Sequence, residues 1–128
     1  MTLFRLLGML LITQLIILNA SCQAVDSTAI SNGTFKELSA KENVVILDVR
    51  TTKEFNEGYI PGAKHIDVLQ AEAFKKQIRT LPKDKTYLIY CRSGKRSATA
   101  LNIMKENGFT NVKHLGNGIR GWDGAIEK

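Results

Sequence analysis

Cysteine, histidine, proline and tryptophan are scarce in this sequence, and their scarcity excludes several classes of protein. The 128 residues include two Cys, two His, two Pro and one Trp. So few cysteines cannot form the disulfide framework of a small secreted scaffold. His65 and His114 have no partner at the spacing of a metal site, so we expect both to be structural. The length excludes a multi-domain enzyme.

The overall composition is that of one globular domain. The chain is 44% hydrophobic and 23% charged, close to globular averages, and it contains no internal repeat. Disordered and collagen-like chains are therefore excluded. The net charge of +6 suits nucleic acid, anionic lipid or an anionic substrate, and the N-terminus described next argues against nucleic acid.

Charge is nearly absent from the first 18 residues, where Arg5 is the one charged side chain. The apolar stretch from Leu6 to Leu18 has 13 residues and would reach about 20 Å as a helix, short of the roughly 30 Å hydrocarbon layer. The pattern is typical of a signal peptide. We therefore expect export, to the periplasm or the outer cell envelope.

The end of this segment reads Leu18-Asn19-Ala20-Ser21-Cys22. Two small residues before a Cys resemble the lipobox of bacterial lipoproteins, although Asn19 stands where Leu is usual. The resemblance implies cleavage before Cys22 and a lipid anchor on its thiol. Secretion with cleavage after Ala24, or an uncleaved anchor, are the alternatives. With lipid on Cys22, Cys91 has no partner for a disulfide.

We predict a signal peptide over residues 1–21, a flexible tether over 22–33 and one domain over 34–128. In that domain, strand-like runs alternate with helical patterns. The pattern predicts strands over 44–47, 64–67, 86–90 and 112–115, and helices over 34–40, 52–58, 71–80, 97–107 and 118–128. Such alternation predicts an α/β fold with a central parallel sheet of about five strands and helices on both faces.

The one segment with reactive chemistry follows the strand over 86–90. It reads Cys91-Arg92-Ser93-Gly94-Lys95-Arg96-Ser97 and leads into a helix. A tight loop at a helix N-terminus points its N–H groups inward and forms an anion cradle, with Cys91 expected at its mouth. Because no His or Asp neighbours Cys91 in sequence, we expect N–H groups and nearby cations to favour its thiolate.

Simpler structural roles remain open for several of these residues. Cys91 could be an inert core thiol, and Arg96 could cap or pair near the helix start. Arg92 or Lys95 could simply face water. Gly94 is expected where the loop needs a positive φ or a close approach. Asp48 and Arg50, and the core residue Trp122, are expected to be structural.

The Cys91–Ser97 loop resembles the active-site loop of rhodanese-like sulfurtransferases. The resemblance extends to Leu47-Asp48-Val49-Arg50 with Glu54-Phe55, to Gly58-Tyr59-Ile60-Pro61-Gly62-Ala63, and to Leu115-Gly116-Asn117-Gly118-Ile119 with Trp122. It covers nearly all of residues 34–122. Tyr59 replaces a frequent His, and Asn117 lies inside the closing glycine pair.

The resemblance implies a two-step sulfur transfer. The Cys91 thiolate would attack the sulfane sulfur of a donor such as thiosulfate, release sulfite and hold a persulfide, which cyanide or a thiol would then discharge. Binding of the anionic donor would fall to Arg92, Ser93, Gly94, Lys95, Arg96 and Ser97. No metal or other cofactor is implied, and we expect a monomer.

Two other functions compete with this interpretation. Cysteine-based phosphatases and arsenate reductases use a similar cradle, but five residues separate their Cys and Arg, whereas four separate Cys91 and Arg96. The smaller ring suits a sulfur atom better than a phosphoryl group. The second alternative is a binding or redox module that recognises a partner without catalysis.

Overall fold

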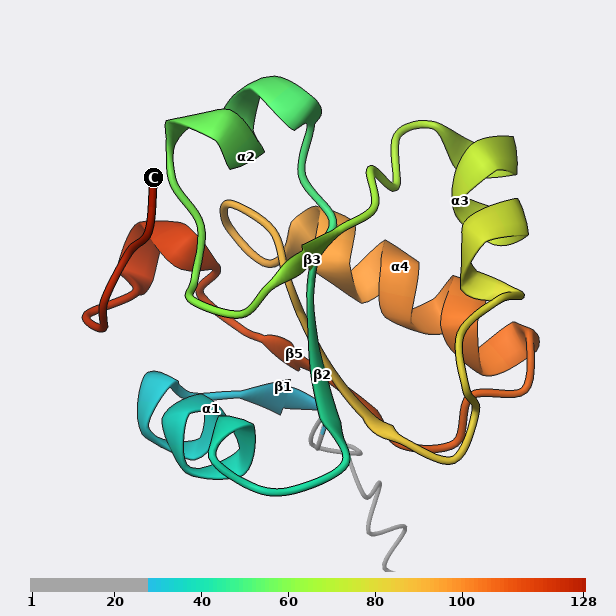
Figure 1. Cartoon of the computed structure of the whole chain (residues 1–128), viewed down its shortest axis with the longest axis horizontal. Coiled ribbons are helices and arrows are strands. Elements are labelled where there is room, and N and C mark those ends of the chain that lie inside the picture. The colour runs from blue at the N-terminus through green and yellow to red at the C-terminus, as the bar shows by residue number, and fades with distance from the viewer. Residues whose placement is uncertain (1–27) are drawn as a thin grey trace, which may run out of the picture.

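A parallel β-sheet of five strands forms the centre of the molecule (Figure 1). The computed structural model describes residues 28–128. Its strands are β1 (Ala29–Ile30), β2 (Val44–Asp48), β3 (Lys64–His65), β4 (Thr86–Tyr90) and β5 (Val112–Leu115). Its helices are α1 (Asn32–Ser39), α2 (Thr52–Glu57), α3 (Ala71–Ile78), α4 (Lys95–Glu106) and the short 3-10 helix η1 (Ile119–Gly121).

The strand order places β4 at the centre of the sheet. The order is β1-β5-β4-β2-β3, and every neighbouring pair is parallel. From the central β2–β4 pair the chain continues outward in opposite directions, from β2 to β3 and from β4 to β5. Ligands bind beyond the carboxyl ends of strands at such a reversal. Cys91 follows β4 directly and therefore lies at this position.

Helices cover both faces of the sheet, as predicted (Figure 1). The side chains of β4 alternate between two apolar clusters, with Tyr87 and Ile89 on one face and Leu88 and Tyr90 on the other. The first cluster packs under α3 and α4, and the second packs under α1 and η1. This two-sided burial explains why β2 and β4 read as continuous apolar runs.

The predicted start is confirmed for α2, whereas α1 starts earlier than predicted. α2 begins at the predicted capping box, in which the side chain of Thr51 accepts from Glu54 N–H and the Glu54 carboxylate accepts from Thr51 N–H. α1 begins earlier than predicted, because Ser31 caps it by accepting from Thr34 N–H at 3.2 Å. Thr34 is therefore inside the helix.

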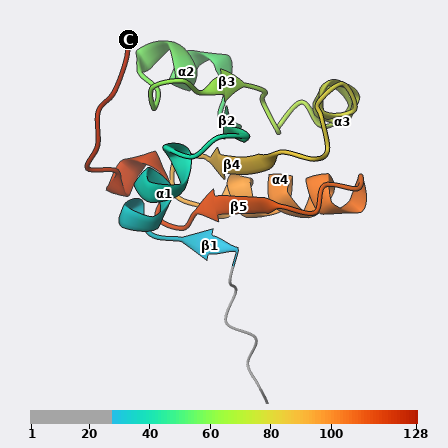
Figure 2. The ribbon, with the colours of Figure 1, turned by 60° about the horizontal axis from the view of Figure 1, so that its bottom comes forward.

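The boundary of the domain also lies earlier than residue 34. Ala29 and Ile30 pair with His114 and Leu115 as the edge strand β1, which Figure 2 shows beside β5. Pairing with β5 fixes residues that the sequence assigned to the tether, so that part of the prediction is wrong. The signal peptide over 1–21, Cys22 and the tether up to residue 27 lie outside the described residues. Within residues 28–128, no helix has the length and apolar character needed to cross a membrane.

The predicted closing helix over 118–128 is wrong. Regular structure there is limited to η1, after which the chain runs across the molecule to form an antiparallel bridge between Tyr59 and Glu127. The backbone groups of these two residues exchange hydrogen bonds of 2.9 Å. A long-range backbone pairing therefore replaces the helix.

Candidate active site

The loop between β4 and α4 turns around the sulfur of Cys91. Gly94 N–H donates to Sγ at 3.1 Å, and the N–H groups of Ser93 and Ser97 also act on the sulfur. Gly94 adopts a φ of 100°, and a Cβ there would lie 2.2 Å from the Gly116 carbonyl oxygen. Only glycine fits this turn. The backbone thus forms the ring of donors expected from the sequence, with the thiol sulfur inside it.

The expected position of Cys91 at the mouth of the loop is wrong. Its side chain is 0% exposed and packs in the cluster under α3 and α4. Burial alone would favour an inert core thiol. The N–H bonds to Sγ argue against that assignment, because they favour a charged sulfur. Arg92 and Ser93, the next two residues of the loop, are exposed.

Two opposing effects set the pKa of the Cys91 thiol. Burial raises it, and hydrogen bonds from the Ser97 hydroxyl and from the backbone N–H groups of Ser97, Gly94 and Ser93 lower it. The hydrogen bonds prevail, so the pKa lies below that of an ordinary thiol. The sequence assigned much of this effect to cations, whereas fixed dipoles and one hydroxyl are the largest contributions that lower the pKa here.

Arg96 forms a bidentate ion pair with Glu54. Its Nη1 and Nη2 donate to the two oxygens of Glu54 at 2.7 and 2.8 Å. This bidentate pair matches the structural alternative left open for Arg96. The guanidinium still attracts the Cys91 thiolate electrostatically, and both Glu54 and the thiolate help raise the pKa of Arg96. Arg96 therefore stabilises negative charge in the loop while it anchors α4 to α2.

The other cations of the loop face solvent. Arg92 and Lys95 are both exposed, and Arg120 on η1 is exposed as well. The backbone of Arg120 donates to the Arg92 carbonyl at 3.0 Å, while Ile119 N–H donates to the Cys91 carbonyl at 2.9 Å. The residues after β5 thus hold the Cys91–Ser97 loop in place through its backbone.

Gly118 explains why the closing segment needs a glycine. It adopts a φ of 64°, and a Cβ there would lie 2.2 Å from the Arg92 carbonyl oxygen. Gly116 has an ordinary φ, and its nearest neighbour at the Cβ position is 3.6 Å away. Asn117 between them therefore interrupts no backbone requirement of the loop.

Ser97 connects the thiol to a second buried side chain. Its Oγ lies 3.6 Å from Cys91 Sγ and 2.9 Å from Nδ1 of His114, and it donates to the Gly94 carbonyl at 3.1 Å. His114 comes from β5 and is 5% exposed. No local sequence signal points to this neighbour, because His114 is 17 residues away from Ser97 along the chain.

The residues after β2 form a buried support next to the loop. Asp48 accepts from the Arg50 backbone N–H at 2.9 Å and from its side chain at 2.6 to 3.0 Å, as the predicted structural pair. Arg50 also donates to the Gly58 carbonyl at 2.7 Å. His65 interacts through Nε2 with the Arg50 carbonyl at 2.6 Å and stacks on Phe55. The prediction of a structural His65 is confirmed.

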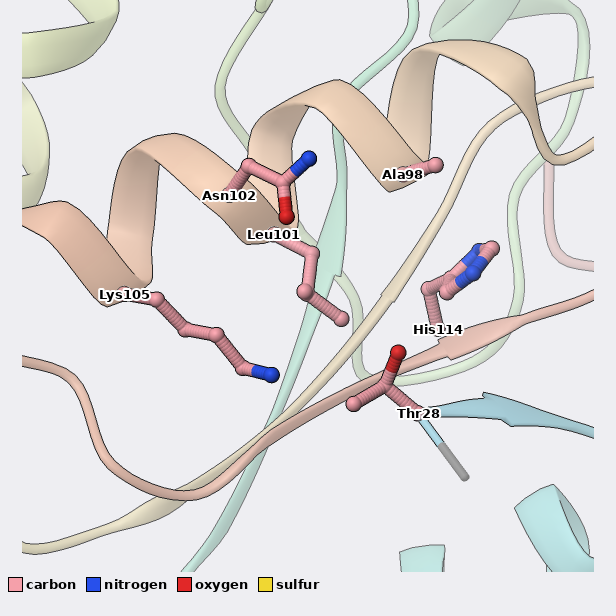
Figure 3. A pocket seen from close by; sticks show the side chains of 6 residues that line it. All are labelled: Thr28, Ala98, Leu101, Asn102, Lys105 and His114. Atoms are coloured by element: carbon pink, nitrogen blue, oxygen red, sulfur yellow. The ribbon is translucent and has the colours of Figure 1, made fainter. Parts of the chain in front are cut away.

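Two cavities lie next to α4 and α3 rather than over the thiol. One of about 230 Å³ is lined by His114 with Thr28, Ala98, Leu101, Asn102 and Lys105 (Figure 3). The other, of about 380 Å³, is lined by Thr52, His65, Ile66, Asp67, Gln70, Ala73 and Gln77. Among residues 28–128, no three His, Cys, Asp or Glu side chains are grouped to hold a metal ion.

The arrangement supplies a nucleophile held ready for attack on an electrophilic atom. The thiol is ionised more readily than an ordinary one, because backbone N–H groups stabilise negative charge on its sulfur. This loop and the Thr51–Glu54 cap carry local sequence signals. The contacts of Glu54 with Arg96 and of Ser97 with His114 carry none, because both join residues distant in the sequence.

Comparison with known proteins identifies relatives over this same region. Residues 31–125 match the family described as rhodanese-like domain. The protein YtwF of Bacillus subtilis is 38% identical over 99 residues, which cover 77% of this chain and 92% of that protein. A protein of Allochromatium vinosum named sulfurtransferase is 36% identical over 100 residues, covering 77% of this chain and 85% of the relative.

The fold has close counterparts among solved structures. The crystal structure of a rhodanese-like domain protein from Staphylococcus aureus superposes with a TM-score of 0.66 at 32% identity. The match covers 78% of this chain and 96% of that one. The matched family region starts at residue 31, in agreement with the early start of α1 at Ser31.

Proposed function

The chain belongs to the family of rhodanese-like domains, and from that membership we propose that it transfers sulfane sulfur through a persulfide on Cys91. The donor is thiosulfate or a similar small anion, and the acceptor is cyanide or a thiol. Relatives of this single domain include a protein named sulfurtransferase. The observation that carries the proposal is the Cys91 sulfur enclosed by N–H donors at the end of the central strand.

In the first step the Cys91 thiolate attacks the outer sulfur of thiosulfate. A bond forms between the two sulfur atoms, the bond from the outer sulfur to the sulfonate sulfur breaks, and sulfite leaves with that electron pair. One negative charge thereby passes from the thiolate to the departing sulfite, and the outer sulfur keeps its own negative charge as the terminal persulfide sulfur. The N–H groups that donate to Sγ stabilise the attacking thiolate, and we expect the same loop donors to stabilise the charge of the persulfide.

In the second step an acceptor removes the terminal sulfur. Cyanide attacks that sulfur, the sulfur–sulfur bond breaks, and its electron pair returns to Cys91 as thiolate, with thiocyanate released. A thiol acceptor would leave as a persulfide in the same way. The two half-reactions share one enzyme intermediate, so ping-pong kinetics are expected.

The loop side chains divide between binding and support. Arg92 and Lys95 are exposed at the loop and attract the dianionic donor. Arg96 acts on the charged sulfur from its fixed place beside Glu54. Ser93 and Gly94 contribute backbone donors, and Ser97 contributes both its N–H and its hydroxyl.

Intact mass spectrometry after incubation with thiosulfate tests the proposal. We expect the protein to gain one sulfur atom, and cyanide to remove it with formation of thiocyanate. Cys91→Ser should lose the gain, whereas Cys22→Ser is the matched control and should keep it. No added sulfur on the Cys22→Ser chain would overturn the proposal in favour of a binding or redox module. Hydrolysis of an aryl phosphate faster than turnover of thiosulfate would favour phosphatase chemistry.

We also propose that the chain is exported and anchored by lipid on Cys22. The apolar segment from Leu6 to Leu18 and the small residues before Cys22 support this proposal. Cell fractionation with intact-mass analysis tests it. A membrane-bound form that lacks residues 1–21 and carries acyl groups is expected, and Cys22→Ser should release the protein from the membrane. An unmodified chain that retains Met1 would contradict it.

A further inference from the structure

The hydroxyl of Ser97 has one proton and three groups that compete for it. In the structure Oγ donates to the Gly94 carbonyl at 3.1 Å, lies 2.9 Å from Nδ1 of His114 and accepts from the protonated Cys91 thiol at 3.6 Å; once Cys91 is ionised, its sulfur can only accept. Ser97 is completely buried, so water does not supply a further donor at its surface. Which acceptor receives the proton decides whether Ser97 stabilises a charged sulfur.

The protonation of Nδ1 resolves this competition. A carbonyl oxygen and a thiolate can only accept, whereas a neutral imidazole nitrogen is a donor in one tautomer and an acceptor in the other. If Nδ1 accepts, its contact with Oγ is the shortest of the three and withdraws the proton from the sulfur. If Nδ1 carries a hydrogen, it donates to a lone pair of Oγ and leaves the hydroxyl proton for Cys91 or Gly94.

We propose that His114 is a positioning residue for sulfur transfer, whose Nδ1–H donates to Ser97 and thereby leaves the Ser97 hydroxyl proton able to turn from the Gly94 carbonyl to the Cys91 thiolate. The inference deepens the proposed function, since it concerns the same nucleophile. His114 is held in place by the sheet, where it is registered beside Ile89 of β4 and Ala29 of β1. Its backbone N–H also donates to the Thr28 carbonyl at 2.8 Å.

His114 lies between the loop and the smaller cavity. Figure 3 shows its ring beside Thr28, with Asn102 and Lys105 of α4 along the same cavity. Of the described residues, Lys105 is the charged group that lines this cavity with His114, and Arg96 is the charged group that acts on Cys91 from α4. Within the described residues, neither Lys105 nor Arg96 hydrogen-bonds to Ser97, and the side chain that contacts Ser97 Oγ from β5 is that of His114.

The first test measures the ionisation of Cys91 without any sulfur donor. In the Cys22→Ser chain, where Cys91 is the single thiol, the rate of alkylation by iodoacetamide is followed against pH. His114→Leu removes the donor and should raise the thiol pKa by about one unit, with about a ten-fold loss of alkylation rate below neutral pH. His114→Asn offers an amide N–H near the position of Nδ1 and should restore much of the acidity.

Two further variants separate this role from general packing. Asn102→Ala changes the same cavity without touching Ser97, so it should leave the thiol pKa as it is. In a chain that already carries Ser97→Ala, His114→Leu should cause no further rise. An unchanged pKa in a folded His114→Leu chain, or equal effects of Asn102→Ala and His114→Leu, would overturn the inference.

The tautomer of His114 provides a test that needs no variant at this position. Nitrogen NMR of the imidazole in the folded protein should show hydrogen on Nδ1. An unprotonated Nδ1 would overturn the inference even if every variant failed to fold. Neither measurement uses thiosulfate, so failure of this inference is distinguishable from failure of sulfur loading on Cys91.

Discussion

Arg96 on the first turn of α4 holds Glu54 on the first turn of α2 through two hydrogen bonds of 2.7 and 2.8 Å. The hydrogen bond from Arg96 is the largest of the effects that lower the pKa of Glu54 to about 2, with Thr51 adding to it and burial opposing it. The pair thus links the catalytic loop to the neighbouring strand end. It also gives the fold a measurable dependence on pH.

Glu54→Gln should remove part of the acid sensitivity of the fold. A carboxyl whose folded pKa lies below its unfolded value stabilises the protein above the unfolded pKa. That stabilisation is lost as pH falls from about 4.5 to about 2. Because the pair is partly exposed, we expect about 1–2 kcal/mol of unfolding free energy to disappear over this window in the parent chain. Urea unfolding at several pH values measures it.

Glu72 offers a matched control for Glu54. Its side chain is 92% exposed and lies 3.7 Å from Lys75, so Glu72→Gln should preserve the pH profile of the parent chain. If Glu54→Gln lost stability between pH 4.5 and 2 as steeply as the parent, the assignment of this acid sensitivity to the Glu54–Arg96 pair would be wrong.

Gly94→Ala should disable the catalytic loop. Both Gly94 and Gly62 have a positive φ, 100° and 81°, so alanine at either position meets the same backbone strain of about 1–2 kcal/mol. At Gly94 the new Cβ would also lie 2.2 Å from a backbone oxygen, whereas nothing lies within 4 Å at Gly62. Gly94→Ala should therefore cost more stability and raise the pKa of the Cys91 thiol.

Denaturant unfolding and the pH dependence of Cys91 alkylation compare the two alanine variants directly. Gly62→Ala should remain folded with an unchanged thiol pKa. Equal stability losses at the two positions would show that the clash between a Cβ at position 94 and the Gly116 carbonyl oxygen costs no stability. This close approach would then not be the reason for a glycine at position 94.

Asp48→Asn should be strongly destabilising. Asp48 is 0% exposed and Arg50 6%, and the carboxylate accepts from both the backbone and the side chain of Arg50. Loss of its charge leaves a buried guanidinium without a counter-ion, which typically costs about 3–5 kcal/mol. Thermal unfolding measures the loss. Asp123→Asn breaks an exposed pair with Lys36 and should leave the melting temperature unchanged.

The sheet could be predicted largely because its inner strands carry local signals. The runs over 44–47 and 86–90 are apolar on both faces, and the predicted and observed strands agree within one residue. The cap at Thr51 is equally local, since its partners are three residues apart. Burial on two faces and capping both leave a pattern in the sequence that needs no knowledge of distant contacts.

Structural features that depend on contacts between distant residues could not be predicted from the sequence. Ala29 and Ile30 form a strand only because β5 provides an edge for them, and two residues carry no alternating pattern. A helix was predicted over residues 118–128, yet the backbone of Glu127 pairs with Tyr59 instead. In each case a tertiary hydrogen bond overrides local propensity.

The candidate site divides in the same way. The anion cradle was predictable because a strand, a glycine and a helix start follow one another in sequence. The burial of Cys91 was not, because the apolar residues that cover it come from other elements. The partner of Ser97 was missed for the same reason, since His114 arrives from the neighbouring strand. The order of residues fixes the backbone of such a loop, and the packing of the whole domain sets its chemistry.

Neutralising the exposed cations of the loop should weaken capture of the donor. Arg92 and Lys95 are exposed beside Cys91 and make no ion pair with another described side chain within 4.0 Å, so their charge is available to an approaching dianion. Arg92→Ala and Lys95→Ala should each raise KM for thiosulfate several-fold, while kcat changes little. Lys41→Ala, exposed after α1 at the opposite end of β2, is the matched control.

Salt separates attraction at a distance from direct contact. Exposed charges are screened over about 8 Å at 0.15 M ionic strength, so kcat/KM of the parent chain should fall as salt is added. The fall should be shallower in the chain that carries both Arg92→Ala and Lys95→Ala. In Lys41→Ala it should be as steep as in the parent chain. Steady-state kinetics with thiosulfate at several salt concentrations provide the measurement. An equally steep fall in the double variant would assign the attraction to other cations, such as Arg120 on η1, whose backbone N–H donates to the Arg92 carbonyl.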